Sequence, residues 1–445
     1  MKALPLRWIV WPAFRTVLIA CLVVPGLSSS GQAPPNPVPG NAADNYLAAA
    51  AKFKKNEKGA EDAGAVAQKG WVGKHPEFEK YLHENAAALA ELREGFKKPY
   101  CSMPTVENYY TKMSYILPFR DMARLLMAEG RMLEAKGQYE AAYQNFTGGA
   151  KFGYGIARNG AFIHYLVSTG VVDIALIAIR RSLANPGASA DTYAKVARWL
   201  EELERTQVSL AEMYRQEMAL NERGLRCVAA DAFEHNVDTL MAGTLCCPPK
   251  SFAWGPAMGL MLLCARSARA GPYPFEKETL WLIWPSNLQT AIDNMKRFCE
   301  EAILRAGKPY SEVVKTSLTV PNDPLSKMLL TSSADWPRPS LYRHFVWAAG
   351  TRAMLALVAY KKVHGRYPKA LDEVLSAGGP PRTDAPLSRT PMDAFSGKPL
   401  RYKPVGDGFL LYSVGPDMVD DHAERECPDR IEAETKGDIV FRMER

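Results

Sequence analysis

The chain has 445 residues, of which 47% are hydrophobic, and this composition excludes a disordered protein. The length provides for two or three domains of about 150 residues each. The formal net charge of +7 arises from 55 basic and 48 acidic residues, and the basic residues Lys2, Arg7 and Arg15 all precede the first acid. The rest of the chain is too balanced in charge to indicate a nucleic-acid partner.

The N-terminus has the pattern of a secretory signal peptide. After the basic stretch, residues 16–27 are almost all apolar, and Gly31-Gln32-Ala33 offers small residues for signal-peptidase cleavage. The apolar run is shorter than the roughly 20 residues of a membrane-spanning helix, so an uncleaved signal anchor is the weaker alternative. Cys21 ends a sequence that resembles a lipoprotein box, which makes lipidation a second, weaker alternative. We therefore expect an exported protein, either periplasmic or extracellular.

Cysteine usage gives no metal motif. An odd number of cysteines remains after cleavage, which leaves at least one unpaired in an oxidising compartment. Cys246 and Cys247 form the only cluster, and a loop whose thiols pair elsewhere or pack as small apolar groups is favoured over a metal or redox site. The disulfide pairing stays open.

The chain up to about residue 330 is predicted to be mostly helical, because apolar residues recur at three- and four-residue spacing. The helices expected from this spacing span residues 41–53, 76–96, 106–133, 162–183, 192–203 and onward to about 241, and 288–306. Pro118 is expected to break the third of them.

One stretch of this region, "AEGRMLEAKGQYEAAYQNFTGGAKFG", resembles a tetratricopeptide-type helical hairpin. The small and aromatic residues that carry the likeness are Gly130, Gly137, Tyr139, Ala142, Phe146 and Gly149. Small residues let two antiparallel helices approach closely, while Tyr139 and Phe146 are expected to fill the groove between them. No second copy follows at a 34-residue period, so a repeat array is not expected.

The most apolar internal run, residues 252–265, is too short to span a bilayer. A buried helix is the favoured interpretation. An interfacial helix that contacts lipid, assisted by Arg266 and Arg269, is the alternative, and it would give the protein a peripheral membrane contact.

The last hundred residues predict a small α+β module. A helix is expected over 343–363 with Gly365 as its stop, followed by a short helix after Pro368. Strands are expected over 400–405 and 409–414, joined by Gly406-Asp407-Gly408, and over 437–443. The expected organisation is a signal peptide at 1–33, a Pro-rich spacer at 34–40, a mainly α helical body at 41–330 and an independently folding α+β module with a short antiparallel sheet at 338–445.

Four segments of this module, "HGRYPKALDEV", "DAFSGKPLRY", "LLYSVGPDMVDD" and "GDIVF", resemble the globular part of the major pseudopilin of type II secretion systems. The whole chain also resembles a group of large bacterial secreted proteins of unknown function. A pseudopilin begins with a hydrophobic helix that joins the pseudopilus core, whereas the corresponding helix here is internal and carries Arg352, Lys361 and Lys362. Polymerisation is therefore not implied.

The resemblance implies a calcium ion in the loop after the hairpin. Asp417 matches the first carboxylate of the family, Val414 and Val419 match residues that give backbone carbonyls, and Asp438 lies next to the second acidic position, which here is Gly437. Calcium takes six to eight oxygen ligands, and such a loop can supply them. A solvated acidic loop without an ion is the alternative. Three further acids could compensate for Gly437: Asp420, Asp421 and Asp429.

No serine-hydrolase, zinc-protease or phosphate-loop motif is present, and no catalytic residue is assigned. The adjacent Glu234 and His235 point in different directions on a helix, so a solvated helix face is favoured over an acid/base couple. The favoured hypothesis is a non-catalytic secreted or cell-envelope protein with a binding or scaffold role through its helical body. The alternative is a secreted hydrolase that acts on cell-wall or glycan polymers. Neither the partner nor the oligomeric state follows from the sequence.

The signal peptide gives the first testable prediction. N-terminal sequencing of the mature protein is expected to begin near Pro34, because cleavage follows Ala33. A mature chain that still begins at Met1 would contradict it.

Overall fold

The computed structural model describes residues 40–108, 111–184, 187–235, 285–316, 318–330, 339–376, 379–428, 431–432 and 434–443. Several sequence predictions lie outside these residues: the signal peptide, most of the spacer, the Cys246-Cys247 pair, the apolar run at 252–265 and the boundary at 331–338. They stay predictions.

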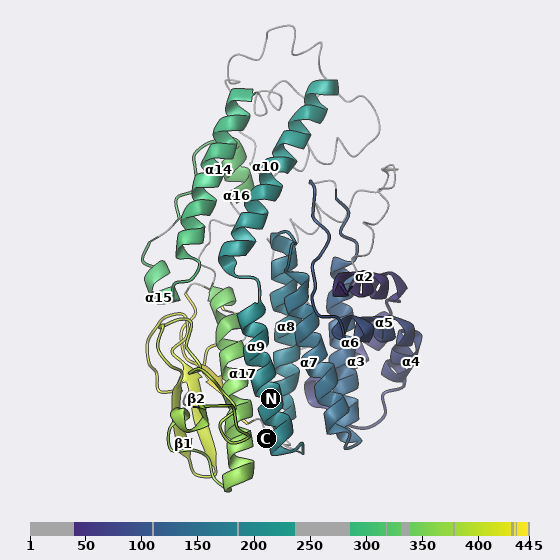
Figure 1. The fold of residues 1–445 in the computed structure, drawn as a ribbon, viewed down its shortest axis with the longest axis vertical. Helices are drawn as coiled ribbons and strands as arrows, with labels where there is room; N and C mark the ends of the chain where they lie inside the picture. The colour runs from purple at the N-terminus through teal and green to yellow at the C-terminus, as the bar shows by residue number, and fades with distance from the viewer. Residues whose placement is uncertain are drawn as a thin grey trace.

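The expected fold class is confirmed, because the described chain is mainly helical with a small three-stranded antiparallel sheet near the C-terminus (Figure 1). The helices of the body are α2 (Ala42–Lys52), α3 (Glu57–Lys69), α4 (Pro76–Glu84), α5 (Ala86–Phe96), α6 (Ile116–Ala135), α7 (Tyr139–Ile156), α8 (Phe162–Ser182), α9 (Ala190–Thr206), α10 (Leu210–His235), α14 (Pro285–Arg305), α15 (Tyr310–Val313) and α16 (Pro324–Leu330). The C-terminal part contains α17 (Pro339–His364), the 3₁₀ helix η1 (Leu371–Val374), β1 (Arg401–Val405), β2 (Gly408–Ser413) and β3 (Ile439–Phe441).

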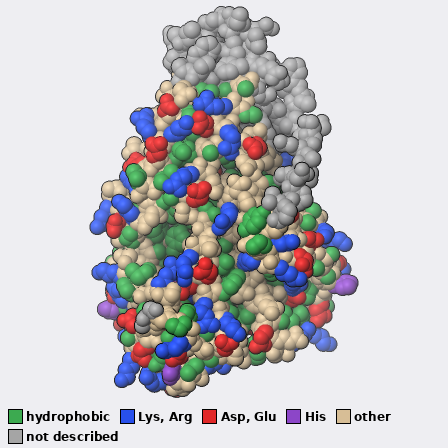
Figure 2. Space-filling view, viewed as in Figure 1, with side chains coloured by type: hydrophobic (Ala, Val, Ile, Leu, Met, Phe, Trp, Pro, Cys, Tyr) green, Lys and Arg blue, Asp and Glu red, His purple; other side chains and the backbone are tan. Residues whose placement is uncertain are grey.

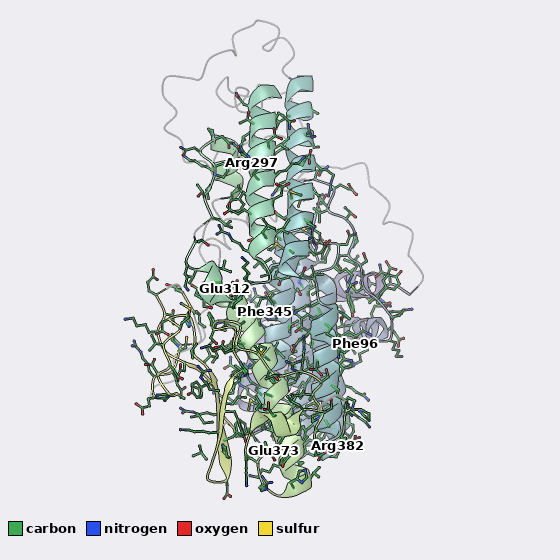
Figure 3. The ribbon with its side chains drawn as sticks, turned by 60° about the vertical axis from the view of Figure 1, so that its left-hand side comes forward. Phe96, Arg297, Glu312, Phe345, Glu373 and Arg382 are labelled. Atoms are coloured by element: carbon green, nitrogen blue, oxygen red, sulfur yellow. The ribbon has the colours of Figure 1, made fainter. Side chains whose placement is uncertain are left out.

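The elements form two regions (Figure 1). Helices α6, α7, α8, α9 and α17 stand side by side, with α2 to α5 at one side and the sheet against α17 at the other. The long helices α10 and α14 pack together and extend from the upper end of this layer. Phe345 lies near the upper end of α17, well above Glu373 and Arg382 at its lower end (Figure 3).

The predicted helical hairpin is formed by α6 and α7. A Cβ added at Gly130 would lie 2.3 Å from Cε1 of Phe146, and one at Gly149 would lie 2.5 Å from Cε of Met127. Both glycines therefore permit the close approach of the two helices. Gly137 has φ +74° directly after α6, a conformation that favours glycine at a helix end. Tyr139 lies against Gly187, in the connection between α8 and α9, whereas the sequence placed it in the groove between α6 and α7.

Two predicted helices have different bounds. The helix expected over 76–96 is divided into α4 and α5 at Asn85, whose buried amide accepts from Lys54 N (2.8 Å) and donates to Lys54 O (3.0 Å). The helix expected over 106–133 begins only at Ile116. Pro118 therefore lies in its first turn, where a missing N–H leaves no intrahelical bond unmade, and it breaks nothing.

Helix α17 belongs to the core of the helical body. Every residue from Ala348 to Tyr360 is buried, and α17 packs against α8 and α9 on one side and the sheet on the other. A Cβ added at Gly350 would lie 2.1 Å from Cζ of Phe441, so β3 sits directly on the helix. One hydrophobic core runs through both the body and the tail. The independent folding of the module stays a prediction, and this packing argues against it, since an isolated tail would expose that face of α17 to water.

Helix α8 is the one described helix long and apolar enough to cross a membrane, with a mean hydropathy of 1.9 over 18 residues. A buried core helix meets the same criterion, and α8 packs against α6, α7 and α17. Its apolar length is therefore weak evidence for a membrane span.

A matched pair of glycine substitutions tests the hairpin. Gly130→Ala is expected to lower the free energy of unfolding by about 1–3 kcal/mol, because the new methyl group overlaps Phe146. Gly170→Ala, in α8, meets no atom within 4 Å and is expected to raise it by about 0.5–1 kcal/mol through helix propensity. Chemical denaturation of the mature protein measures both. Equal effects of the two changes would show that Gly130 is not required for close packing.

Candidate functional site

The candidate site is the loop of residues 414–438, which leaves β2 and returns to β3. Strands β1 and β2 pair antiparallel with Arg401 opposite Tyr412, and β2 pairs with β3 with Leu411 opposite Phe441. The predicted hairpin and third strand are thus confirmed. Because β2 is the central strand, the two ends of the loop meet at one edge of the sheet.

Asp393 fixes the beginning of the loop. Its buried carboxylate accepts hydrogen bonds from Ser413 Oγ and Ser396 Oγ, both at 2.7 Å, and from Phe395 N at 3.0 Å. Val414 N also approaches it, at 3.4 Å. The "DAFSG" segment therefore has a structural role: it holds the end of β2 in place.

The four predicted calcium ligands lie in different environments. Asp417 is half-buried and accepts from Val419 N (3.3 Å) and Gly437 N (3.1 Å), so it joins the two ends of the loop. Val414 is buried and Val419 is exposed. Asp438 is fully buried, and its Oδ2 accepts from Ala423 N at 2.7 Å. Asp438 Oδ1 has no hydrogen-bond partner among the described residues.

Gly437 cannot be replaced by the acid that the resemblance places there. Its φ is +104°, a region that side chains other than glycine rarely adopt, and an added Cβ would lie 2.7 Å from Arg425 O. Gly415 approaches from the other side, where an added Cβ would lie 2.1 Å from Gly437 O. The loop is thus closed by backbone contacts at Gly415 and Gly437, and the nearest acid in the chain is Asp438.

The electrostatics of the loop single out Asp438. Burial raises the pKa of this carboxyl, and the charges of Asp420 and Asp421 add to the rise, although the Ala423 and Asp421 amides oppose it. The Asp421 amide acts on this carboxyl, yet Oδ1 has no hydrogen-bond partner among the described residues. Burial also acts on Asp420, but hydrogen bonds from His422 N, Tyr412 Oη and Arg401 hold the pKa of Asp420 below its usual value. The charge of Asp420 is therefore compensated more fully than that of Asp438, whose pKa stays raised.

A calcium ion would fit only one part of this arrangement. No cluster of three or more His, Cys, Asp or Glu side chains suited to a metal occurs in the described part of the chain. An ion would therefore depend on Asp438 Oδ1, one further carboxylate and backbone carbonyls, as the sequence predicts for Val414 and Val419. The orphaned oxygen is the observation that favours the ion, and calcium stays a prediction.

Comparison with known proteins adds no support. No protein-family model, curated protein or solved structure matched the chain. The resemblance to the pseudopilin module and to large secreted proteins therefore stays a prediction that rests on the sequence segments named above.

A second polar cluster, which the sequence did not predict, joins the tail to the body. Glu201 on α9 is 2% exposed and lies 3.0 Å from Nη1 of Arg352 on α17, which is also 2% exposed. Oε2 of Glu201 accepts from both N and Oγ of Ser388, each at 2.9 Å. Arg389 reaches Oε2 of Glu204 at 3.0 Å, and burial raises the pKa of Glu204, with Arg352 and Arg389 opposing the rise. The sequence signal was Arg352 itself, a lone charge within "AAGTRAMLALVAY".

Two buried cysteines have thiols that are poorly suited to nucleophilic or metal-binding roles. Cys101 and Cys299 are both buried, and burial raises the pKa of each to about 12. A thiol rather than a thiolate is a poor nucleophile and a poor metal ligand. Both side chains therefore act as small apolar groups.

The calcium prediction is tested on the full mature chain. Bound calcium would stabilise the fold by RT ln(1 + [Ca]/Kd), about 2.7 kcal/mol at a hundredfold excess over Kd, so melting should occur at a higher temperature in millimolar calcium than in chelator. Asp438→Asn should abolish the difference while retaining the acceptor for Ala423 N.

Asp407→Asn, in the hairpin turn, is the matched control and should keep the calcium effect. Asp417→Ala is less informative, since it would also remove acceptors for two backbone amides and destabilise the chelated protein. Identical melting curves of the wild type in calcium and chelator would mean that the loop is only an acidic turn.

Proposed function

We propose that this chain is a non-catalytic secreted or cell-envelope protein with a binding or scaffold role. The observation that carries the proposal is the burial of α17 in the helical body, secured by the contact of Arg352 with Glu201. Body and tail then act as one rigid unit rather than as an enzyme with a mobile appendage. A rigid stack of helices offers a preformed surface, and such a surface binds with little loss of conformational entropy.

The hydrolase alternative requires two accessible carboxylates that converge on a substrate. Glu201 and Glu204 do converge, at 3.0 and 3.5 Å from Nη1 of Arg352. Ser388 and Arg389 close over them from the tail, so both carboxylates serve the junction. This pair therefore supports a structural role better than a catalytic one.

The surface is of mixed charge. On the face shown in Figure 2, acidic and basic side chains alternate over the described residues. This distribution supports a protein or polymer partner rather than a nucleic acid, which would require a basic stripe. The predicted membrane contact rests on residues 252–265, outside the described chain, and stays a prediction, as does the calcium-stabilised tail.

Sedimentation with native envelope fractions tests the proposal. The purified mature chain is mixed with cell-wall sacculi or with outer-membrane vesicles, and bound protein and soluble sugar are both measured. We expect saturable co-sedimentation with one fraction and no release of soluble fragments over hours.

The Glu204→Gln variant is the matched control for turnover. If the wild type releases soluble glycan fragments and Glu204→Gln does not, the hydrolase alternative holds and the proposal fails. If neither fraction retains the protein, the binding role in the envelope fails. The two outcomes test different residues. Release of fragments tests the carboxylates of the junction, whereas retention by a fraction tests the outer surface of the protein.

A further inference from the structure

A small cavity lies where α7, α8 and α17 meet the turn between α9 and α10. The centre of a water molecule can occupy a volume of about 10 Å³ in this cavity. Its polar lining comes from six residues: Tyr154, Tyr165, Ser168, Thr169, Gln207 and His344. A cavity of this size is just large enough for one water.

His344 is oriented within this cavity by an acid. Its Nδ1 lies 2.6 Å from Asp173 Oδ1, and the imidazole is 2% exposed. The Asp173 contact fixes the ring, so the second nitrogen, Nε2, is held at a defined place.

Two hydroxyl groups line the cavity beside His344, and one of them is buried without a partner among the described residues. The Tyr154 hydroxyl is buried and has no hydrogen-bond partner in the described part of the chain. Ser168, which is 3% exposed, lines the same cavity. Buried polar groups are seldom left without partners, and ordered water is the usual partner where protein groups do not supply one.

Ser168, His344 and Asp173 also share the residue types of a nucleophile, a base and an orienting acid. A catalytic triad would need room for an acyl substrate next to the serine. The volume of about 10 Å³ has room for one water, and the hydrogen bond that the His344 ring makes within the described residues goes to Asp173 rather than to Ser168. The same three residues are therefore better explained as ligands and support of a bound water.

We propose that this cavity binds one ordered water molecule, held by the Tyr154 hydroxyl, Ser168 Oγ and His344 Nε2. The three groups can supply two to four hydrogen bonds, which is the number that a buried water makes. The water joins α7 and α8 of the body to α17 of the tail. It lies beside the Glu201–Arg352 contact and extends that polar junction along α17.

A crystal structure of the mature protein at high resolution tests the site directly. A density peak is expected at about 2.7–3.2 Å from the Tyr154 hydroxyl and from His344 Nε2. An empty cavity would overturn the proposal. A peak with five or more oxygens at about 2.4 Å would also overturn it, because that geometry indicates a cation.

Thermal melting supplies a second test with a matched control. Tyr154→Phe should lower Tm by about 2 °C, because the water loses a partner. Tyr46→Phe removes another buried hydroxyl that has no partner among the described residues, but Tyr46 does not line the cavity, so Tm should stay equal or rise. If Tyr154→Phe raises Tm as Tyr46→Phe does, the Tyr154 hydroxyl holds no water and the proposal fails.

Discussion

The buried charge of Arg352 is the constraint on which the arrangement of body and tail depends. An arginine at 2% exposure in an apolar helix costs several kcal/mol of desolvation unless carboxylates and hydrogen bonds surround it. Glu201 and Glu204 supply the carboxylates from α9, and residues 388–389 of the tail complete the shell of Glu201. Moving α17 away from α9 would separate Arg352 from both of its carboxylates. The junction therefore sets the position of the tail more strictly than apolar packing alone, which tolerates small shifts.

The close approach of neighbouring segments is the second constraint, and glycine permits this approach at three places in the structure. Gly130 lets α6 meet α7, Gly350 lets β3 meet α17, and Gly437 lets the acidic loop close against residues 425–427. In each case an added Cβ would fall below 3 Å from a neighbouring atom. Gly130 and Gly350 permit dense packing of the core. At Gly437 the positive φ and the close backbone contacts disfavour any side chain, including an acidic one.

Local patterns in the sequence predicted most of the elements, because helix periodicity and turn chemistry act over a few residues. Gly365 after α17 and Gly406 in the hairpin are both in the predicted places. Two of the errors came from distant contacts: Asn85 lies at a helix break where its amide binds Lys54, and Tyr139 packs against Gly187. The error at Pro118 was local, because the helix begins only two residues before it. The candidate site followed the same rule. Asp417 and Asp438 were found by motif, but the orphaned Oδ1 of Asp438 depends on Ala423 and on burial, which no local pattern encodes.

The environment of α17 also bears on the resemblance to pseudopilins. In that family the corresponding helix joins the core of a polymer, which requires one of its faces to be free. Here α8 and α9 cover one side of α17, the sheet covers the other, and residues from Ala348 to Tyr360 are all buried. Arg352 could not enter an apolar polymer core without its carboxylates. Because α17 is covered in this way, any assembly of this chain would have to use the outer surface of its helical body.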